Sequence, residues 1–109
     1  MSTEFRRAAS PQAVRAWEVT LDAELPPAAA AVTAERARTV AELLVHMPGI
    51  GAAVVRPHCQ GRFLYASLVV EARDLQDAVD RGAVLLRDCA TAAGVGPLIL
   101  VAARHSCTA

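Results

Sequence analysis

The fold of this chain is decided by the stretch FLYASLVVEARDLQDAVDRGAVLLRDCATAAGVGPLILVAA, residues 63–103. Residues 63–72 alternate between more and less apolar side chains, as in a half-buried strand. Asp74, with Asp77 three residues later, can cap and charge the start of a helix, and Gly94 follows the last residue of an apolar stripe. Residues 98–103 are apolar again. The stretch therefore predicts a strand, a helix and a second strand.

A looser copy of the same pattern comes earlier, in residues 17–57. Residues 17–25 alternate strictly until a pair of prolines, and residues 50–57 are apolar enough for another strand. Between these strands, apolar residues recur at helical spacing, which predicts a helix over residues 33–47 that ends at a Pro-Gly pair. The segment Thr39–Glu42 has the spacing of a capping box inside that range.

Two such units in the order βαββαβ predict an α+β domain. If both crossovers are right-handed, the simplest arrangement is a ferredoxin-like sandwich. Its antiparallel sheet has four strands in the order 4-1-3-2, with two helices on one face. We expect this single domain over residues 16–106, a flexible N-terminal arm over residues 1–15 and a C-terminal tail over residues 107–109.

Composition excludes several classes of protein. The formal net charge is zero, so no bulk field draws the chain to nucleic acid or to anionic membranes, and we expect neither as a partner. The sequence contains no lysine, which excludes lysine Schiff bases, lysine-anchored pyridoxal phosphate and the P-loop. No apolar run is long enough to cross a membrane, and no signal-peptide pattern is present. We therefore expect a cytoplasmic protein whose three cysteines are reduced.

The sheet face without helices is the candidate binding surface. The more apolar sets, which include Trp17, Val19, Leu64 and Leu68, should face the helices. From the last strand, either Leu98 and Leu100 or Ile99 and Val101 should join the open face. Phe63 begins the set that alternation places there. We predict ligand or partner binding by Glu18, Thr20, Asp22, Phe63, Tyr65 and Ser67, with Glu24, Val69 and Glu71 beside them.

This mixed aromatic and aliphatic surface favours a homodimer that packs sheet against sheet. The leading hypothesis is a small binding or regulatory domain that holds an apolar or amphipathic small molecule, or a protein partner, on its open face. One alternative is a dimeric α+β barrel enzyme that uses Asp22, Tyr65 or a histidine as acid or base on a hydrophobic substrate. Another is a structural assembly module. The simplest alternative to the dimer is a monomer whose own N-terminal arm covers the face. The simplest alternative to acid–base chemistry is that the acids only solvate an exposed strand face and pair with Arg62 or Arg104.

Two further motifs carry weaker predictions. The segment Gly61–Tyr65 has aromatics two residues apart, as in strands that stack on RNA bases, but acids on the neighbouring strand would repel phosphates. His58-Cys59 and His105–Cys107 contain zinc-type ligands, yet the predicted topology puts them at opposite corners of the sheet. We therefore predict no metal site and no cofactor.

Overall fold

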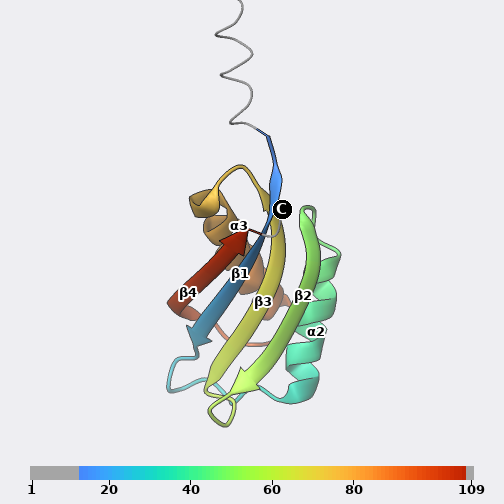
Figure 1. The fold of residues 1–109 in the computed structure, drawn as a ribbon. Helices are drawn as coiled ribbons and strands as arrows, with labels where there is room; N and C mark the ends of the chain where they lie inside the picture. Colours follow the sequence, from blue (N-terminus) through green and yellow to red (C-terminus); the bar gives the residue numbers. More distant parts are fainter. Residues whose placement is uncertain (1–12, 108–109) are drawn as a thin grey trace, which may run out of the picture.

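The computed structural model describes residues 13–107 and contains two helices and four strands (Figure 1). The elements follow the predicted order of strand, helix, strand, strand, helix, strand. They are β1 (Arg15–Glu24), α2 (Ala34–Val45), β2 (Ile50–His58), β3 (Phe63–Ala72), α3 (Leu75–Ala92) and β4 (Ile99–Cys107). None of the described helices is both long enough and apolar enough to span a membrane.

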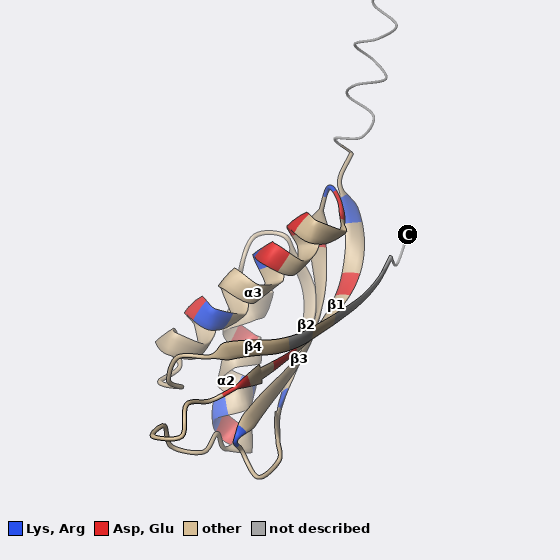
Figure 2. Ribbon diagram, turned by 90° about the vertical axis from the view of Figure 1, so that its left-hand side faces the viewer, with Lys and Arg blue, Asp and Glu red and all other residues tan. Residues whose placement is uncertain are grey.

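The four strands form one antiparallel sheet in the order β2-β3-β1-β4, which is the predicted order read from the other edge. Strands β3 and β1 are central, and β2 and β4 are the two edges. Both helices lie on the same side of the sheet (Figure 2). The chain is thus an α+β domain, and its strand order fits a ferredoxin-like arrangement.

The core lies between the sheet and the helices because each central strand alternates strictly. The side chains of Val19 and Leu21 on β1 are fully buried, as are those of Leu64 and Leu68 on the neighbouring strand β3. From α3, Leu86 closes the same core, and Gly82 lies beside the Leu68 side chain, where a Cβ atom would make an ordinary contact of 3.5 Å. The predicted helix-covered face is therefore confirmed.

The first helix begins later than the start of the predicted range by one residue, and its cap is not the predicted one. Thr33 is the N-cap, and its hydroxyl oxygen accepts a hydrogen bond from the backbone nitrogen of Arg36. Thr39 instead lies inside the helix and donates to the carbonyl oxygen of Glu35, so the capping-box interpretation is wrong. The helix ends at Val45, before Pro48.

The second helix is capped as predicted. Asp74 is the N-cap and accepts a hydrogen bond of 2.8 Å from the backbone nitrogen of Asp77. A hydrogen bond from the backbone nitrogen of Arg73 and another from the Arg81 side chain lower the pKa of Asp77. After the helix, Gly94 adopts a φ of +83°, and the guanidinium of Arg36 donates to its carbonyl oxygen over 2.9 Å.

The chain between β1 and α2 is held against the β2–β3 turn. Gly61, with a φ of +82°, accepts a hydrogen bond from the backbone nitrogen of Val32. A Cβ atom at position 61 would lie only 2.6 Å from the carbonyl oxygen of Val32. The Arg62 guanidinium donates to the carbonyl oxygens of Ala29 over 2.7 Å and Pro26 over 2.5 Å. These contacts tie two loops into one end of the domain.

The last strand is longer than predicted, since β4 continues to Cys107 instead of ending near residue 103. Pairing with β1 over its full length supplies the extra backbone partners. The register shifts between Asp22 and Ala23, where β4 carries an extra residue. Similarly, β1 begins at Arg15, two residues earlier than the alternation suggested. The arm and tail predictions for residues 1–12 and 108–109 fall outside the described residues.

Candidate functional site

The sheet face opposite the helices brings the predicted binding residues together. Strand register places Asp22 opposite Tyr65 and Thr20 opposite Ser67 on the two central strands. Directly opposed residues of an antiparallel pair point to the same face and have Cβ atoms about 4.5–5.5 Å apart. The same pairing places Glu24 opposite Phe63 and Glu18 opposite Val69. All six predicted residues therefore occupy one continuous surface, which we call the open face.

Neither helix covers the open face in the part of the chain that the structure describes, and Figure 1 looks directly onto it. Its central side chains are nevertheless only partly exposed. Thr20, Asp22, Phe63, Tyr65 and Ser67 are all half-buried by their neighbours in the sheet, and Glu18 is exposed. The centre of this face is thus a closely packed surface of mixed polarity.

An arginine from the edge strand lies over the aromatic ring at the centre of this face. The guanidinium carbon of Arg56 on β2 is 5.1 Å from the centroid of the Tyr65 ring. A cation at this distance is attracted to the negative face of the ring. The row Arg56, Tyr65, Asp22 therefore combines a cation, a phenol and a carboxylate across three strands.

Apolar side chains flank this polar row on both edge strands. Val54 on β2 pairs with Ser67 and is 52 % exposed, and Ile99 on β4 pairs with Glu24 and is 57 % exposed. By contrast, Leu98 and Leu100 line a small cavity with α3 on the other side of the sheet. Sequence alternation left open whether Leu98 and Leu100 or Ile99 and Val101 face away from the helices. The structure places Ile99 on the open face and Leu98 and Leu100 on the helix side.

Arg62 does not neutralise the acids of the open face as one alternative proposed. Its guanidinium is occupied by the carbonyl oxygens of Pro26 and Ala29. Glu18 and Asp22 both make interactions with other groups. The backbone of Arg104 pairs with that of Thr20. Arg62 therefore holds the loop after β1 in place, and Glu18 and Asp22 interact with other groups.

The two candidate metal motifs lie on opposite edges of the sheet. His58 is the last residue of β2 and Cys59 follows it in the turn, whereas His105–Cys107 belongs to β4, and β3 and β1 separate the two motifs. No group of three or more His, Cys, Asp or Glu side chains suited to a metal ion occurs among the residues that the structure describes.

The two described free cysteines have different surroundings. Cys59 is exposed, whereas Cys89 is buried in the core, and burial raises the pKa of the Cys89 thiol.

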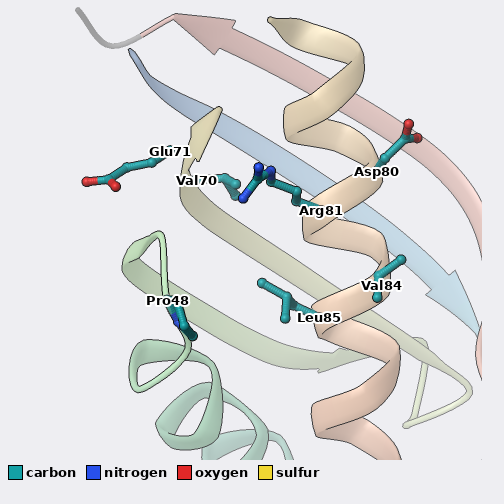
Figure 3. Close-up of a pocket in the computed structure, with 7 residues that line it drawn as sticks. All are labelled: Pro48, Val70, Glu71, Asp80, Arg81, Val84 and Leu85. Atoms are coloured by element: carbon teal, nitrogen blue, oxygen red, sulfur yellow. The ribbon is translucent and has the colours of Figure 1, made fainter. Parts of the chain in front are cut away.

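A second surface feature was not predicted from the sequence. A groove of about 420 Å³ lies on the helix side, between α3 and the turn that follows α2 (Figure 3). Val70 of β3 forms its floor, and Val84 and Leu85 of α3 form one wall, with Pro48 opposite. We call this feature the inter-helix groove. Its sequence signal was the apolar pair Val84-Leu85, which lies outside the main buried stripe of α3.

Charged side chains border the inter-helix groove. Glu71 and Asp80 project away from it, while the Arg81 side chain extends over Val70 (Figure 3). The Arg81 guanidinium donates to Asp77 over 3.1 Å, which fixes it near the start of α3. The groove is therefore apolar inside and charged at its rim.

No protein-family model matches the sequence, and a search of the curated proteins found no match.

Proposed function

We propose that this chain is a ferredoxin-like domain that forms a homodimer through its open face and holds a small amphipathic molecule between the two sheets. The observation that carries this proposal is the composition of the open face. Half-buried aromatic and hydroxyl side chains occupy its centre, exposed aliphatic side chains flank them, and neither described helix covers them. Exposed aliphatic side chains around a half-buried aromatic and polar centre are consistent with an interaction site.

The dimensions of the open face suit a second copy. Four strands of 9 or 10 residues make a surface about 19 Å wide and about 30 Å long. A typical stable interface buries about 800 Å² on each partner, so the dimer would have to bury nearly the whole of the open face. Val54 and Ile99, on opposite edges, would both be buried by a facing sheet. A two-fold axis through the centre would bring each edge strand against the partner.

The central row indicates the chemistry of the bound molecule. The Tyr65 phenol and the hydroxyls of Thr20 and Ser67 can donate or accept hydrogen bonds. Phe63 and Val69, on the same face of β3, offer apolar contacts on either side of them. A ligand with one hydrogen-bonding end and one apolar end matches this distribution. A protein partner with a similar side chain at its surface is the alternative occupant.

Acid–base catalysis in the same pocket is the second candidate function. It is favoured by one specific arrangement, the direct opposition of Asp22 and Tyr65 in the register of the central strands. A carboxylate and a phenol this close can pass a proton to or from a bound substrate.

Native mass spectrometry of the purified full chain tests the proposed function. We expect a dimer that carries extra mass from a retained small molecule. Tyr65→Ala and Phe63→Ala should lose that mass because both remove contact area from the centre, whereas Asp22→Asn should keep it. If both aromatic variants retain the ligand, the open face is not its binding site. A dimer without extra mass would instead favour protein binding or a structural assembly.

The catalytic alternative gives a different result with the same variants. Once a ligand has been identified by its mass, turnover can be followed by its conversion. Asp22→Asn should then abolish conversion without loosening the dimer if Asp22 acts as acid or base. An unchanged rate in Asp22→Asn would exclude Asp22 from the mechanism and leave binding as the function.

A further inference from the structure

The side chains of Arg56 and Tyr65 lie together on the open face with their hydrogen-bond donors available to a ligand. The guanidinium carbon is 5.1 Å from the ring centroid, and the Arg56 side chain makes no hydrogen bond or ion pair with any residue that the structure describes. The Tyr65 hydroxyl makes no hydrogen bond within the described residues either. A guanidinium carries five N–H donors in a planar fork, and a phenol adds one O–H donor. The pair can therefore bind an acceptor that a ligand supplies.

The contact with Tyr65 limits the freedom of the Arg56 side chain before any ligand binds. The Tyr65 ring is half-buried among its neighbours in the sheet, whereas Arg56 is exposed on the edge strand β2. Attraction between the cation and the ring favours the conformations in which the guanidinium lies over the ring. Because less rotamer freedom is then lost on binding, a ligand held by Arg56 gains affinity.

The distribution of charge on the open face indicates which kind of anion Arg56 would bind. The acids of β1, among them Asp22, are separated from β2 by β3, so their backbones are about 9–10 Å from that of Arg56. These acids would repel an anion that lay nearer to β1, which leaves the β2 side for the negative end of a ligand. One guanidinium balances one negative charge, and its fork matches the two oxygens of a carboxylate. A singly charged carboxylate therefore fits better than a doubly charged phosphate.

An apolar path leads away from Arg56 along β2 and β3. Val54, which is 52 % exposed, precedes Arg56 by two residues and so lies on the same face of the strand. Ala52 comes next on that face and pairs with Val69 of β3. The four residues from Arg56 to Ala52 span about 13 Å of strand. This path can accommodate an extended apolar tail whose charged end lies at Arg56.

We propose that the molecule held by the open face is an amphipathic monocarboxylic acid. Its carboxylate accepts hydrogen bonds from the Arg56 guanidinium and the Tyr65 hydroxyl, and its apolar tail lies over Val54 and Val69. This assignment rests on the proposed function of the open face, and it specifies the chemical class and the orientation of the ligand. In the dimer, the facing sheet would cover the tail and shield it from water.

Isothermal titration calorimetry of the full chain at pH 7 tests the assignment with three ligands of equal chain length. Decanoate, decanol and decylamine share one apolar tail and differ in the charge of the head group. We expect decanoate to bind about tenfold more tightly than decanol, because a charge-assisted hydrogen bond is stronger than a neutral one. Decylamine should bind most weakly, since the Arg56 guanidinium repels its ammonium group.

Variants of Arg56 separate the head group from the tail. Arg56→Gln removes the charge, so it should weaken decanoate binding about tenfold and leave decanol binding unchanged. Arg56→Lys keeps the charge but not the planar fork and should give an intermediate affinity for decanoate. Arg87→Gln is the matched control, because Arg87 is an exposed arginine on α3, on the helix side of the sheet (Figure 2). This control should bind all three ligands as the wild type does.

The possible outcomes distinguish this assignment from the proposed function. If decanol binds the wild type as tightly as decanoate, or if decylamine binds most tightly, the carboxylate assignment is overturned while the open face remains an amphipathic binding site. A preference for decanoate that persists in Arg56→Gln would also overturn it, since another group would then hold the carboxylate. If none of the three ligands binds, the ligand-binding part of the proposed function fails together with this assignment.

Discussion

At the scale of single residues, the β2–β3 turn depends most strongly on side-chain identity. Three consecutive residues, Cys59, Gln60 and Gly61, have positive φ values of 50°, 58° and 82°. Cys59 and Gln60 adopt this conformation at the usual cost to residues with a Cβ atom. At Gly61 the requirement is stricter, because the backbone of Val32 lies where a Cβ atom would be.

Gly61→Ala should therefore lower the free energy of unfolding by about 2 kcal/mol or more, because a left-handed conformation and a backbone collision both disfavour alanine there. Urea denaturation measures the change. Gly51→Ala is the matched control, since its Cβ atom would make an ordinary contact of 3.5 Å with Val69. The control should change stability by less than about 0.5 kcal/mol. Equal effects at both positions would contradict the steric explanation.

At the scale of secondary-structure elements, α3 is the element whose start is most fully specified. Asp74 caps its first turn, and Asp77 accepts hydrogen bonds from the backbone of Arg73 and from the side chain of Arg81. The Asp77 carboxylate also lies at the positive end of the helix dipole. These interactions favour the ionised form, so the pKa of Asp77 in the folded state lies below its usual value.

This lowered pKa gives the domain a pH dependence with a definite sign. Because the unfolded state binds the proton more readily, the stabilisation from Asp77 is present above its unfolded-state pKa, about 3.9, and is lost as the pH falls through its lower folded-state pKa. Asp77→Asn should thus lower the Tm near pH 7 by a few degrees, and the difference from wild type should shrink below about pH 4. Calorimetry across that range measures it.

Asp88→Asn is the control on the same helix. Asp88 lies near the C-terminal end of α3, where the dipole disfavours negative charge. Its removal should leave the Tm near pH 7 unchanged or slightly raised. A loss of stability as large as that in Asp77→Asn would show that replacing an aspartate anywhere in this helix is destabilising, and that the effect is not specific to the hydrogen bonds at Asp77.

At the scale of the whole molecule, the two sides of the sheet have different surroundings. Both helices lie on one side of the sheet (Figure 2). The other side presents Val54 and Ile99 to solvent at its edges. The proposed dimer would bury the second side and leave the helices outside. A charge placed on the open face should therefore disrupt association, while the same charge on a helix should not.

Val54→Asp and Val45→Asp make this comparison with one residue type. Val54 lies on the open face and is 52 % exposed, and Val45 lies at the end of α2 and is 43 % exposed. Analytical ultracentrifugation should show a dimer for wild type and Val45→Asp and a monomer for Val54→Asp, because burying an unpaired carboxylate is costly. A wild-type monomer, or a Val54→Asp dimer, would refute sheet-to-sheet pairing.

The sequence alone determined the elements and the sides on which their residues lie. Strict alternation in residues 63–72 specified both the strand and its buried face, because successive side chains of a strand point in opposite directions. Asp74 specified the start of α3 because an N-cap acts on the backbone only three residues away. Alternation likewise suffices to assign the candidate binding residues of β1 and β3 to one face of the sheet.

Only the tertiary structure decided which distant groups meet. The guanidinium of Arg62 binds carbonyl oxygens more than 30 residues earlier in the chain, a contact that no local pattern encodes. Thr39 had a capping sequence, but Thr33 is the N-cap of α2, and the register shift beside Asp22 set the facing of β4. The inter-helix groove depends on how α3 packs beside the turn after α2. Such features follow from the relative placement of whole elements, whereas sequence periodicity records only what each element does by itself.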